Sequence, residues 1–213
     1  MLKLFSTGRK AVLLVILVLF LDQFLKIWVK THLYYNQSIP VFGFWFRICF
    51  IENDGMAFGM EFGGSYGKIL LTLVRILAVS AIAFYLHFLL RQKANRGLVY
   101  AIALVLAGAA GNIFDSVFYG VIFSESTTYQ LAVLFPKGGG YASFLHGKVV
   151  DMLFFPLYNG NYPGWMPFIG GREMTFFEHV FNLADASITT GVLIILVFRR
   201  RYFHAGLTAP VKQ

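Results

Sequence analysis

The sequence has few charged residues and a single cysteine, and both shortages exclude whole classes of protein. Of its 213 residues only 13% are charged and 58% are hydrophobic, with a mean hydropathy of +0.68. Soluble domains carry about 25% charged residues, so this composition is typical of a polytopic membrane protein. Cys49 has no second cysteine to pair with, which excludes an internal disulfide. One membrane domain covering residues 1–213 is the simplest organisation.

Motifs of metal-binding and nucleophilic enzymes are missing as well. The histidines form no HExxH pattern and there is no CxxC pair, so neither a metal nor another cofactor is expected. No GxSxG motif and no Ser–Lys or Cys–His pairing points to a nucleophilic side chain. The formal net charge of +8 does not indicate a nucleic-acid partner, because the basic residues gather at the ends of apolar runs.

What the sequence does contain is a series of long apolar segments. Four are long enough to cross a bilayer as helices: residues 11–31, 67–90, 97–118 and 176–198. The first looks like the apolar part of a secretory signal peptide, but no small-x-small cleavage site follows it. Residues 33–66, rich in Phe and Trp, are expected to form a small strand-rich element at the membrane surface. Residues 119–175 are expected to form a long loop region.

The basic residues predict how these helices are oriented. The N-terminus, the short loop 91–96 and the run Arg199–Arg201 are all basic. Short basic segments stay in the cytoplasm, so both termini are expected there. Four spanning helices satisfy this arrangement, and both long connections then lie on the opposite side of the membrane.

Polar residues inside the apolar segments are the candidates for function, because such groups are costly in a bilayer. At about 1.5 Å of rise per residue, all of them fall in the outer half of a core about 30 Å thick. These residues are Asp22, Lys26, Asn112, Asp115, Asn182 and Asp185. Asn182 and Asp185, three residues apart, share a helix face. Asp151 belongs to the outer loop and reaches the same depth if residues 153–157 dip toward the membrane.

Two carboxylates that meet in a partly dry site, Asp151 and Asp185, define a possible chemistry. They are not both comfortably ionised there, so one is expected to hold a proton. The ionised acid can take a proton from water while the protonated acid donates a hydrogen bond to a carbonyl oxygen. This is general acid–base hydrolysis of a peptide without a metal or a covalent intermediate.

Five short motifs support this interpretation when taken together and in order. They are Asp22-Gln23 with Lys26; Asn53 with Gly55, Ala57 and Phe58; Gly108 with Gly111, Asn112 and Asp115; Val149-Val150-Asp151; and Phe181-Asn182 with Ala184 and Asp185. Each motif is weak alone, but their order over about the whole chain resembles the lipoprotein signal peptidases (signal peptidase II). These are bacterial aspartic peptidases of the inner membrane.

The resemblance implies an all-α polytopic membrane protein with four transmembrane helices, a small periplasmic β-element and an active site toward the periplasm. It implies Asp151 and Asp185 as the catalytic pair. The residues that it implies as substrate-binding or supporting are Asn53, Asn112, Asp115, Asn182, Gly108, Ala184, Asp22 and Lys26. No metal takes part.

The resemblance also implies the partners. The substrate is a prolipoprotein that carries diacylglycerol on a cysteine, and cleavage falls just before this cysteine. Membrane lipid and a cyclic peptide inhibitor of the globomycin type are further expected partners, nucleic acid is not, and the protein is expected to be a monomer.

The sequence departs from the family pattern at two places. Ser116 stands where the family usually has arginine, and Arg75 and Lys148 are the candidates to replace that charge. Two stretches, 116–150 and 158–175, are longer than the family pattern. We expect them to form an additional periplasmic cap that alters access to the site.

Simpler interpretations stay open for several of these residues. Asp22 and Lys26, four residues apart, are typical of an ion pair on one helix face. Asp115 is equally compatible with pairing to a cation, and Asn53 with a simple turn. A proton-coupled carrier is the alternative function, although a transporter with internal repeats fits four helices poorly. A non-enzymatic assembly partner is a third.

Overall fold

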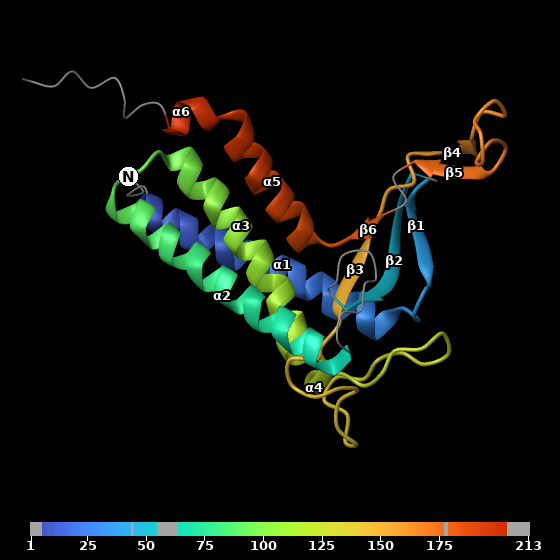
Figure 1. Ribbon diagram of the computed structural model, residues 1–213. Helices are drawn as coiled ribbons and strands as arrows, with labels where there is room; N and C mark the ends of the chain where they lie inside the picture. Colours follow the sequence, from blue (N-terminus) through green and yellow to red (C-terminus); the bar gives the residue numbers. More distant parts are fainter. Residues whose placement is uncertain (1–5, 44, 55–63, 177–178, 204–213) are drawn as a thin grey trace, which may run out of the picture.

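A helical bundle forms the body of the protein. The computed structural model describes residues 6–43, 45–54, 64–176 and 179–203. The main helices are α1 (Thr7–His32), α2 (Gly64–Arg91), α3 (Arg96–Phe114) and α5 (Leu183–Val197). A π-helical turn, η2 (Asp115–Tyr119), and the short α4 (Gly120–Ile122) extend α3, and α6 (Arg199–Phe203) follows α5. Figure 1 shows the helices running side by side with the sheet at one end.

Three of these helices are long and apolar enough to cross a membrane in the part of the chain that the structure describes. They are Thr7–His32, Tyr66–Arg91 and Arg96–Ile122. The predicted segments 11–31, 67–90 and 97–118 lie inside them. Their outward faces expose large apolar side chains, among them Phe20, Leu77 and Phe84, as expected for surfaces in contact with lipid.

The predicted helix at 176–198 is wrong in its extent. Helix α5 has 15 residues and begins at Leu183, which gives a length of about 22 Å, against about 30 Å for a hydrocarbon core. Residues 180–181 form strand β6 instead. Asn182 follows this strand as the N-cap of α5, and Val180 and Phe181 before it belong to the sheet. A count of four spans is therefore not established by helix length.

A four-stranded antiparallel sheet, in the order β1-β2-β3-β6, lies at one end of the bundle, which we call the sheet end. Its strands are β1 (Ser38–Phe42), β2 (Phe46–Asn53), β3 (Val149–Phe154) and β6 (Val180–Phe181). A separate hairpin, β4 (Tyr158–Asn161) with β5 (Glu173–Phe176), follows β3. The strands predicted within residues 33–66 are β1 and β2. Gly55, Ala57 and Phe58 of the second motif lie outside the described residues.

The prediction that Asp151 belongs to a loop is wrong, because Asp151 lies within β3. Its strand pairs with β2, and Asp151 is opposite Ile51. Residues 149–152 are all buried, so the strand lacks the alternation of buried and exposed residues that identifies a half-exposed strand in a sequence. The register brings Asp151 to the junction between the sheet and the helices.

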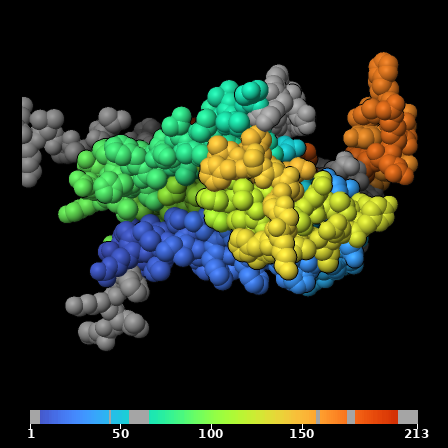
Figure 2. All heavy atoms as spheres, turned by 90° about the horizontal axis from the view of Figure 1, so that it is seen from below, coloured from blue at the N-terminus to red at the C-terminus, as the bar shows by residue number. Residues whose placement is uncertain are grey.

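An apolar cluster fixes this junction. It joins the end of α1 to the sheet and the turn after α3, with Phe50, Tyr119, Phe123 and Met152 buried at its centre. Residues 123–147 fold over the same end of the bundle, and Tyr141 packs against the cluster. Figure 2 shows this segment (yellow) against the helices, while the hairpin β4–β5 (orange) stands apart. The sheet is thereby held against the helices that carry the remaining polar residues.

Candidate active site

The start of α5 positions the first carboxylate of the site. Asn182 is the N-cap, and its side-chain oxygen accepts a hydrogen bond of 2.9 Å from the backbone N–H of Asp185. The Asp185 carboxylate in turn accepts a bond of 3.3 Å from the backbone N–H of Asn182. This reciprocal capping box satisfies two backbone donors at the helix start and fixes both side chains.

The side-chain amide of Asn182 also links Asp151, the other carboxylate predicted to be catalytic, to this helix start. It donates to Asp151 Oδ1 at 2.7 Å and to Asn112 Oδ1 at 3.1 Å. Asn112 of α3 then donates to Asp185 Oδ1 at 2.8 Å. Asp151 from the sheet therefore contacts the fully buried side chain of Asn182 directly, whereas the Asp185 carboxylate is linked to Asn182 through the amide of Asn112 and through the backbone N–H of Asn182. The structure brings together the residues that the sequence placed at one depth.

Burial and charge set the protonation of Asp151. The residue is 6% exposed, and Asn53 Nδ2 lies 3.5 Å from its second oxygen. Burial, and after it the nearby charge of Asp185, raise the pKa of Asp151 to about 7, although the hydrogen bond from Asn182 opposes this shift. A carboxyl group with this pKa holds a proton for part of the time near neutral pH, as a general acid must.

A second polar cluster lies deeper between the helices and centres on Lys26. Its ammonium group pairs with Asp22 at 2.8 Å and with Asp115 at 2.7 Å, and all three side chains are essentially fully buried. The predicted ion pair between Asp22 and Lys26 is confirmed. Lys26 also donates to Asn112 Oδ1 at 2.8 Å. The cluster thus holds Asn112, and through it Asp185, without contacting Asp151.

Asp22 and two glycines hold α5 against its neighbours. Asp22 Oδ1 accepts a hydrogen bond of 2.9 Å from the backbone N–H of Ala184, one of the unpaired donors in the first turn of α5. A Cβ at Gly108 would lie 2.2 Å from the carbonyl oxygen of Ala184, and one at Gly111 would lie 2.8 Å from Asp22 Oδ2. These two glycines therefore permit the close approach of α3 to α5 and to Asp22 of α1.

The structure distinguishes between Arg75 and Lys148, the two candidates to replace the arginine that the family usually has. The Ser116 hydroxyl donates a hydrogen bond of 3.0 Å to the carbonyl oxygen of Asn112, one turn earlier along the same stretch of helix. Lys148 lies 3.8 Å from Glu52 and is 37% exposed, so its charge is directed elsewhere. Arg75 of α2 interacts electrostatically with Asp185. Arg75 is therefore the cation, of these two, that acts on the carboxylate pair.

Sequence reasoning missed a buried group beside the site. Lys30 is fully buried and pairs with Glu52, and it donates to Ser126 Oγ at 2.8 Å. The rings of Phe50, Phe123 and Tyr141 surround its ammonium group at 4.9–5.5 Å from their centroids. A signal was present in the sequence, since Asp22, Lys26 and Lys30 recur every four residues and so share one helix face.

Gln23, which lies in the first sequence motif but was not among the predicted site residues, also belongs to the cluster around Lys26. Its side-chain amide donates to Asp115 Oδ1 at 2.8 Å and to Asp22 Oδ2 at 3.2 Å, and its oxygen accepts from Tyr119 at 3.0 Å. It therefore links α1 to η2. Within the described ranges, no group of three His, Cys, Asp or Glu residues is arranged to hold a metal ion.

The fold and these contacts define a class of protein. Two acids from different elements meet beside a shared amide at the end of an apolar helical bundle, one of them with a pKa near neutrality. Apolar helices of this length cross membranes. A carboxylate pair of this kind is typical of the active site of an aspartic peptidase, here one embedded in a membrane.

Comparisons with known proteins identify the family within this class. The model of the signal peptidase II family matches residues 14–200. A lipoprotein signal peptidase of Porphyromonas gingivalis is 47% identical over 89% of this chain and 82% of its own length. One from Amoebophilus asiaticus is 37% identical over 93% of this chain and 79% of its own. The chain belongs to the signal peptidase II family, and its function is that of a lipoprotein signal peptidase, a membrane hydrolase.

Solved structures share the fold. A bacterial membrane enzyme determined by the in meso method at 2.3 Å resolution superimposes with a TM-score of 0.59 over 96% of this chain and 94% of its own. A second, at 1.9 Å resolution, gives a TM-score of 0.57. Their sequences are only 20% and 22% identical to this chain, so the likeness concerns the fold alone.

Proposed function

We propose that Asp151 and Asp185 are the catalytic pair with which this lipoprotein signal peptidase hydrolyses its substrate. The observation that carries the proposal is the amide of Asn182. It donates to Asp151 at 2.7 Å, and the capping box holds the same residue against Asp185. The site residues expected from the sequence thus acquire distinct roles.

In this mechanism Asp151 is the acid and Asp185 the base. Water attacks the scissile carbonyl carbon while Asp185 takes one of its protons, and Asp151 gives its own proton to the carbonyl oxygen. A tetrahedral gem-diol results. Its collapse breaks the C–N bond, the leaving nitrogen takes the proton from Asp185, and a hydroxyl proton returns to Asp151. Both acids are then ready for the next cycle, and no cofactor is consumed.

The surrounding residues hold the pair in position. Lys26 fixes Asn112, which donates to Asp185, and Asp22 anchors the first turn of α5 through Ala184. Asp115 balances the charge of Lys26. Gly108 permits the contact between α3 and α5, and Asn53 lies beside Asp151. We assign these residues to positioning and Arg75 to the electrostatics of the pair.

The proposal includes the orientation and the substrate. Helix α5 is the fourth span, both termini lie in the cytoplasm, and the sheet end of the bundle faces the periplasm across the inner membrane. The substrate is a diacylglyceryl-modified prolipoprotein, cleaved before the lipidated cysteine, with its acyl chains in the surrounding lipid. A monomer suffices, and a cyclic peptide of the globomycin type is expected to compete for the site. The segments 116–150 and 158–175 remain our candidates for a cap.

The test is cleavage of a diacylated lipopeptide by the protein in detergent, with no ion gradient present. Asp151→Asn and Asp185→Asn are each expected to abolish cleavage without lowering the melting temperature. Glu125→Gln, which changes an exposed carboxylate outside the site, is the matched control and should retain full activity. Near-normal cleavage by either aspartate variant would show that the pair is not catalytic.

A further inference from the structure

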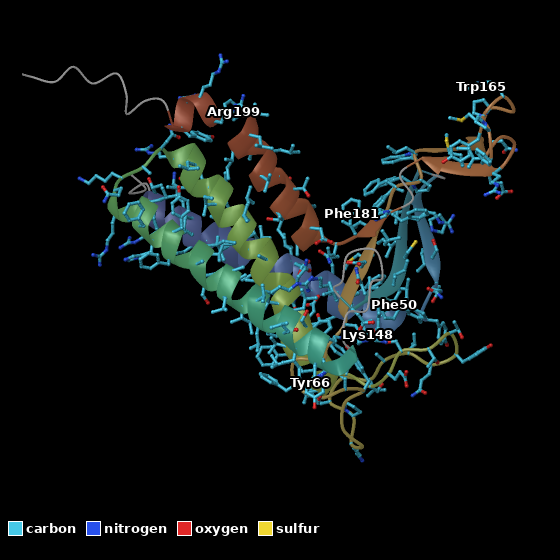
Figure 3. All side chains as sticks on the ribbon, viewed as in Figure 1. Phe50, Tyr66, Lys148, Trp165, Phe181 and Arg199 are labelled. Carbon is cyan, nitrogen blue, oxygen red and sulfur yellow. The ribbon has the colours of Figure 1, made fainter. Side chains whose placement is uncertain are left out.

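The hairpin β4–β5 belongs to the second segment proposed as a cap, and it contributes no residue to the contacts of the carboxylate pair described above. Its strands pair from Tyr158↔Phe176 to Asn161↔Glu173, and residues 162–172 connect them. In Figure 1 the hairpin lies at the end of the sheet farthest from the helices. It extends to the side of the bundle on which α5 runs and does not continue outward along the bundle axis. Figure 3 places Trp165 at the far end of this extension.

The connecting segment exposes large apolar side chains. Trp165 is 80% exposed and Phe168 is 94% exposed, and no charged residue occurs between Tyr162 and Gly171. Phe168 adopts a φ of +70°, a left-handed conformation that is unfavourable for an aromatic residue. Exposed aromatic side chains without charged neighbours are typical of surfaces that contact a partner or a membrane.

Part of the backbone of this segment is already paired. Five N–H groups of residues 162–172 donate to carbonyls of the same segment at 2.9–3.1 Å: Tyr162 to Arg172, Met166 to Pro163, Gly170 to Met166, Gly171 to Tyr162, and Arg172 to Ile169. Irregular backbone is costly in an apolar medium mainly through unpaired polar groups. This turn therefore enters a weakly hydrated layer at a lower cost than an open loop of the same length.

We propose that residues 163–170, which we call the hairpin tip, insert into the interfacial layer of the lipid leaflet that surrounds the sheet end of the bundle. Three helices of this chain are long and apolar enough to cross a bilayer, so a hairpin that extends sideways from their ends would lie over lipid. Tryptophan is enriched at the level of lipid headgroups. The exposed Arg172 next to the tip supplies a positive charge for lipid phosphate.

A row of stacked aromatic rings connects the segment before this hairpin to the active site. Phe155, between β3 and the hairpin, stacks on Phe46 at 4.7 Å and on Phe181 at 5.7 Å between ring centroids. Trp45 lies beside the same ring at 6.3 Å. Phe181 immediately precedes Asn182 in the chain. A tip held by lipid would therefore restrain the sheet that carries Asp151.

Fluorescence quenching by lipid tests the proposal directly. The protein has three tryptophans, so Trp28→Phe with Trp45→Phe leaves Trp165 as the single reporter. The protein is reconstituted in phosphatidylcholine–phosphatidylglycerol nanodiscs with or without lipid brominated near the upper part of its acyl chains. The control adds Trp165→Phe and Tyr129→Trp, because Tyr129 is 91% exposed on the other long segment. Each variant is first checked for an unchanged melting temperature.

Brominated lipid is expected to quench the reporter at position 165 several-fold more than the reporter at position 129, and aqueous acrylamide to quench it less. Equal quenching at the two positions would overturn the proposal. Shielding of position 165 from both quenchers would also overturn it, because protein would then cover the tip. The readout needs no catalysis, so loss of the proposed peptidase mechanism would leave this result unaffected.

Discussion

The protonation of Asp151 predicts a steep dependence of cleavage on pH. Its pKa is raised to about 7, and the proposed mechanism requires the protonated form. The protonated fraction then falls from about 90% at pH 6 to about 1% at pH 9. Each further pH unit above the pKa lowers the protonated fraction of Asp151 about tenfold. We therefore expect kcat/KM to fall on the order of a hundredfold over this range.

The assay is cleavage of a fluorogenic diacylated lipopeptide in a non-ionic detergent, in which the surface charge of the micelle does not change with pH. Melting temperatures recorded across the same range separate unfolding from loss of chemistry. A rate that stayed constant between about pH 6 and about pH 9 would contradict the assignment of Asp151 as the acid.

Stability provides a second measurement of the same ionisation. A folded-state pKa above the unfolded value of about 3.9 means that the folded protein binds the proton more tightly. This contribution is complete below about pH 4 and is lost as the pH rises to about 7, at a cost of at most ~4 kcal/mol. Asp151→Asn removes it, so this variant should gain stability relative to the wild type as the pH rises.

Three further perturbations test the contacts around the carboxylate pair and the buried ion pair of Lys30. Asn182→Ser keeps a capping oxygen but removes the donor to Asp151, so kcat should fall at least about tenfold and the pH midpoint should move upward, since that bond lowers the pKa of Asp151. Gly108→Ala places a Cβ against the backbone of α5 and should cost about 1–3 kcal/mol of stability with a loss of activity. Lys30→Met should destabilise by ~3 kcal/mol because Glu52 loses its buried partner, and adding Glu52→Gln should restore much of this loss, both measured by thermal unfolding.

These perturbations have built-in controls. Gly138→Ala adds the same methyl group where no atom lies within 4 Å, so its melting temperature should match the wild type. An unchanged pH midpoint in Asn182→Ser would contradict the role of that amide. If Gly108→Ala behaved like Gly138→Ala, the close contact between α3 and α5 would not be needed. If Glu52→Gln failed to rescue Lys30→Met, the cost would arise from packing rather than from the unpaired charge.

Several features of this protein could be predicted from the sequence because they depend on local composition. Hydropathy over about twenty residues identified α1, α2 and α3, since a spanning helix satisfies its own backbone and needs only apolar side chains. The spacing of Asp22 and Lys26 predicted their ion pair. The short ordered motifs predicted the family, because the chemistry of a carboxylate pair demands particular side chains whatever surrounds them.

Only the tertiary structure decided how these pieces meet. Asp151 is held at the site by pairing of β3 with β2, two strands far apart in the chain, and no local pattern specifies such a register. The same holds for Asn182, whose apolar neighbours resemble a helix but form a strand, so that α5 starts at the cap. The raised pKa of Asp151 is a property of the tertiary structure. Asp151 is buried and lies near the charge of Asp185 only when the sheet packs against the start of α5 at Asn182.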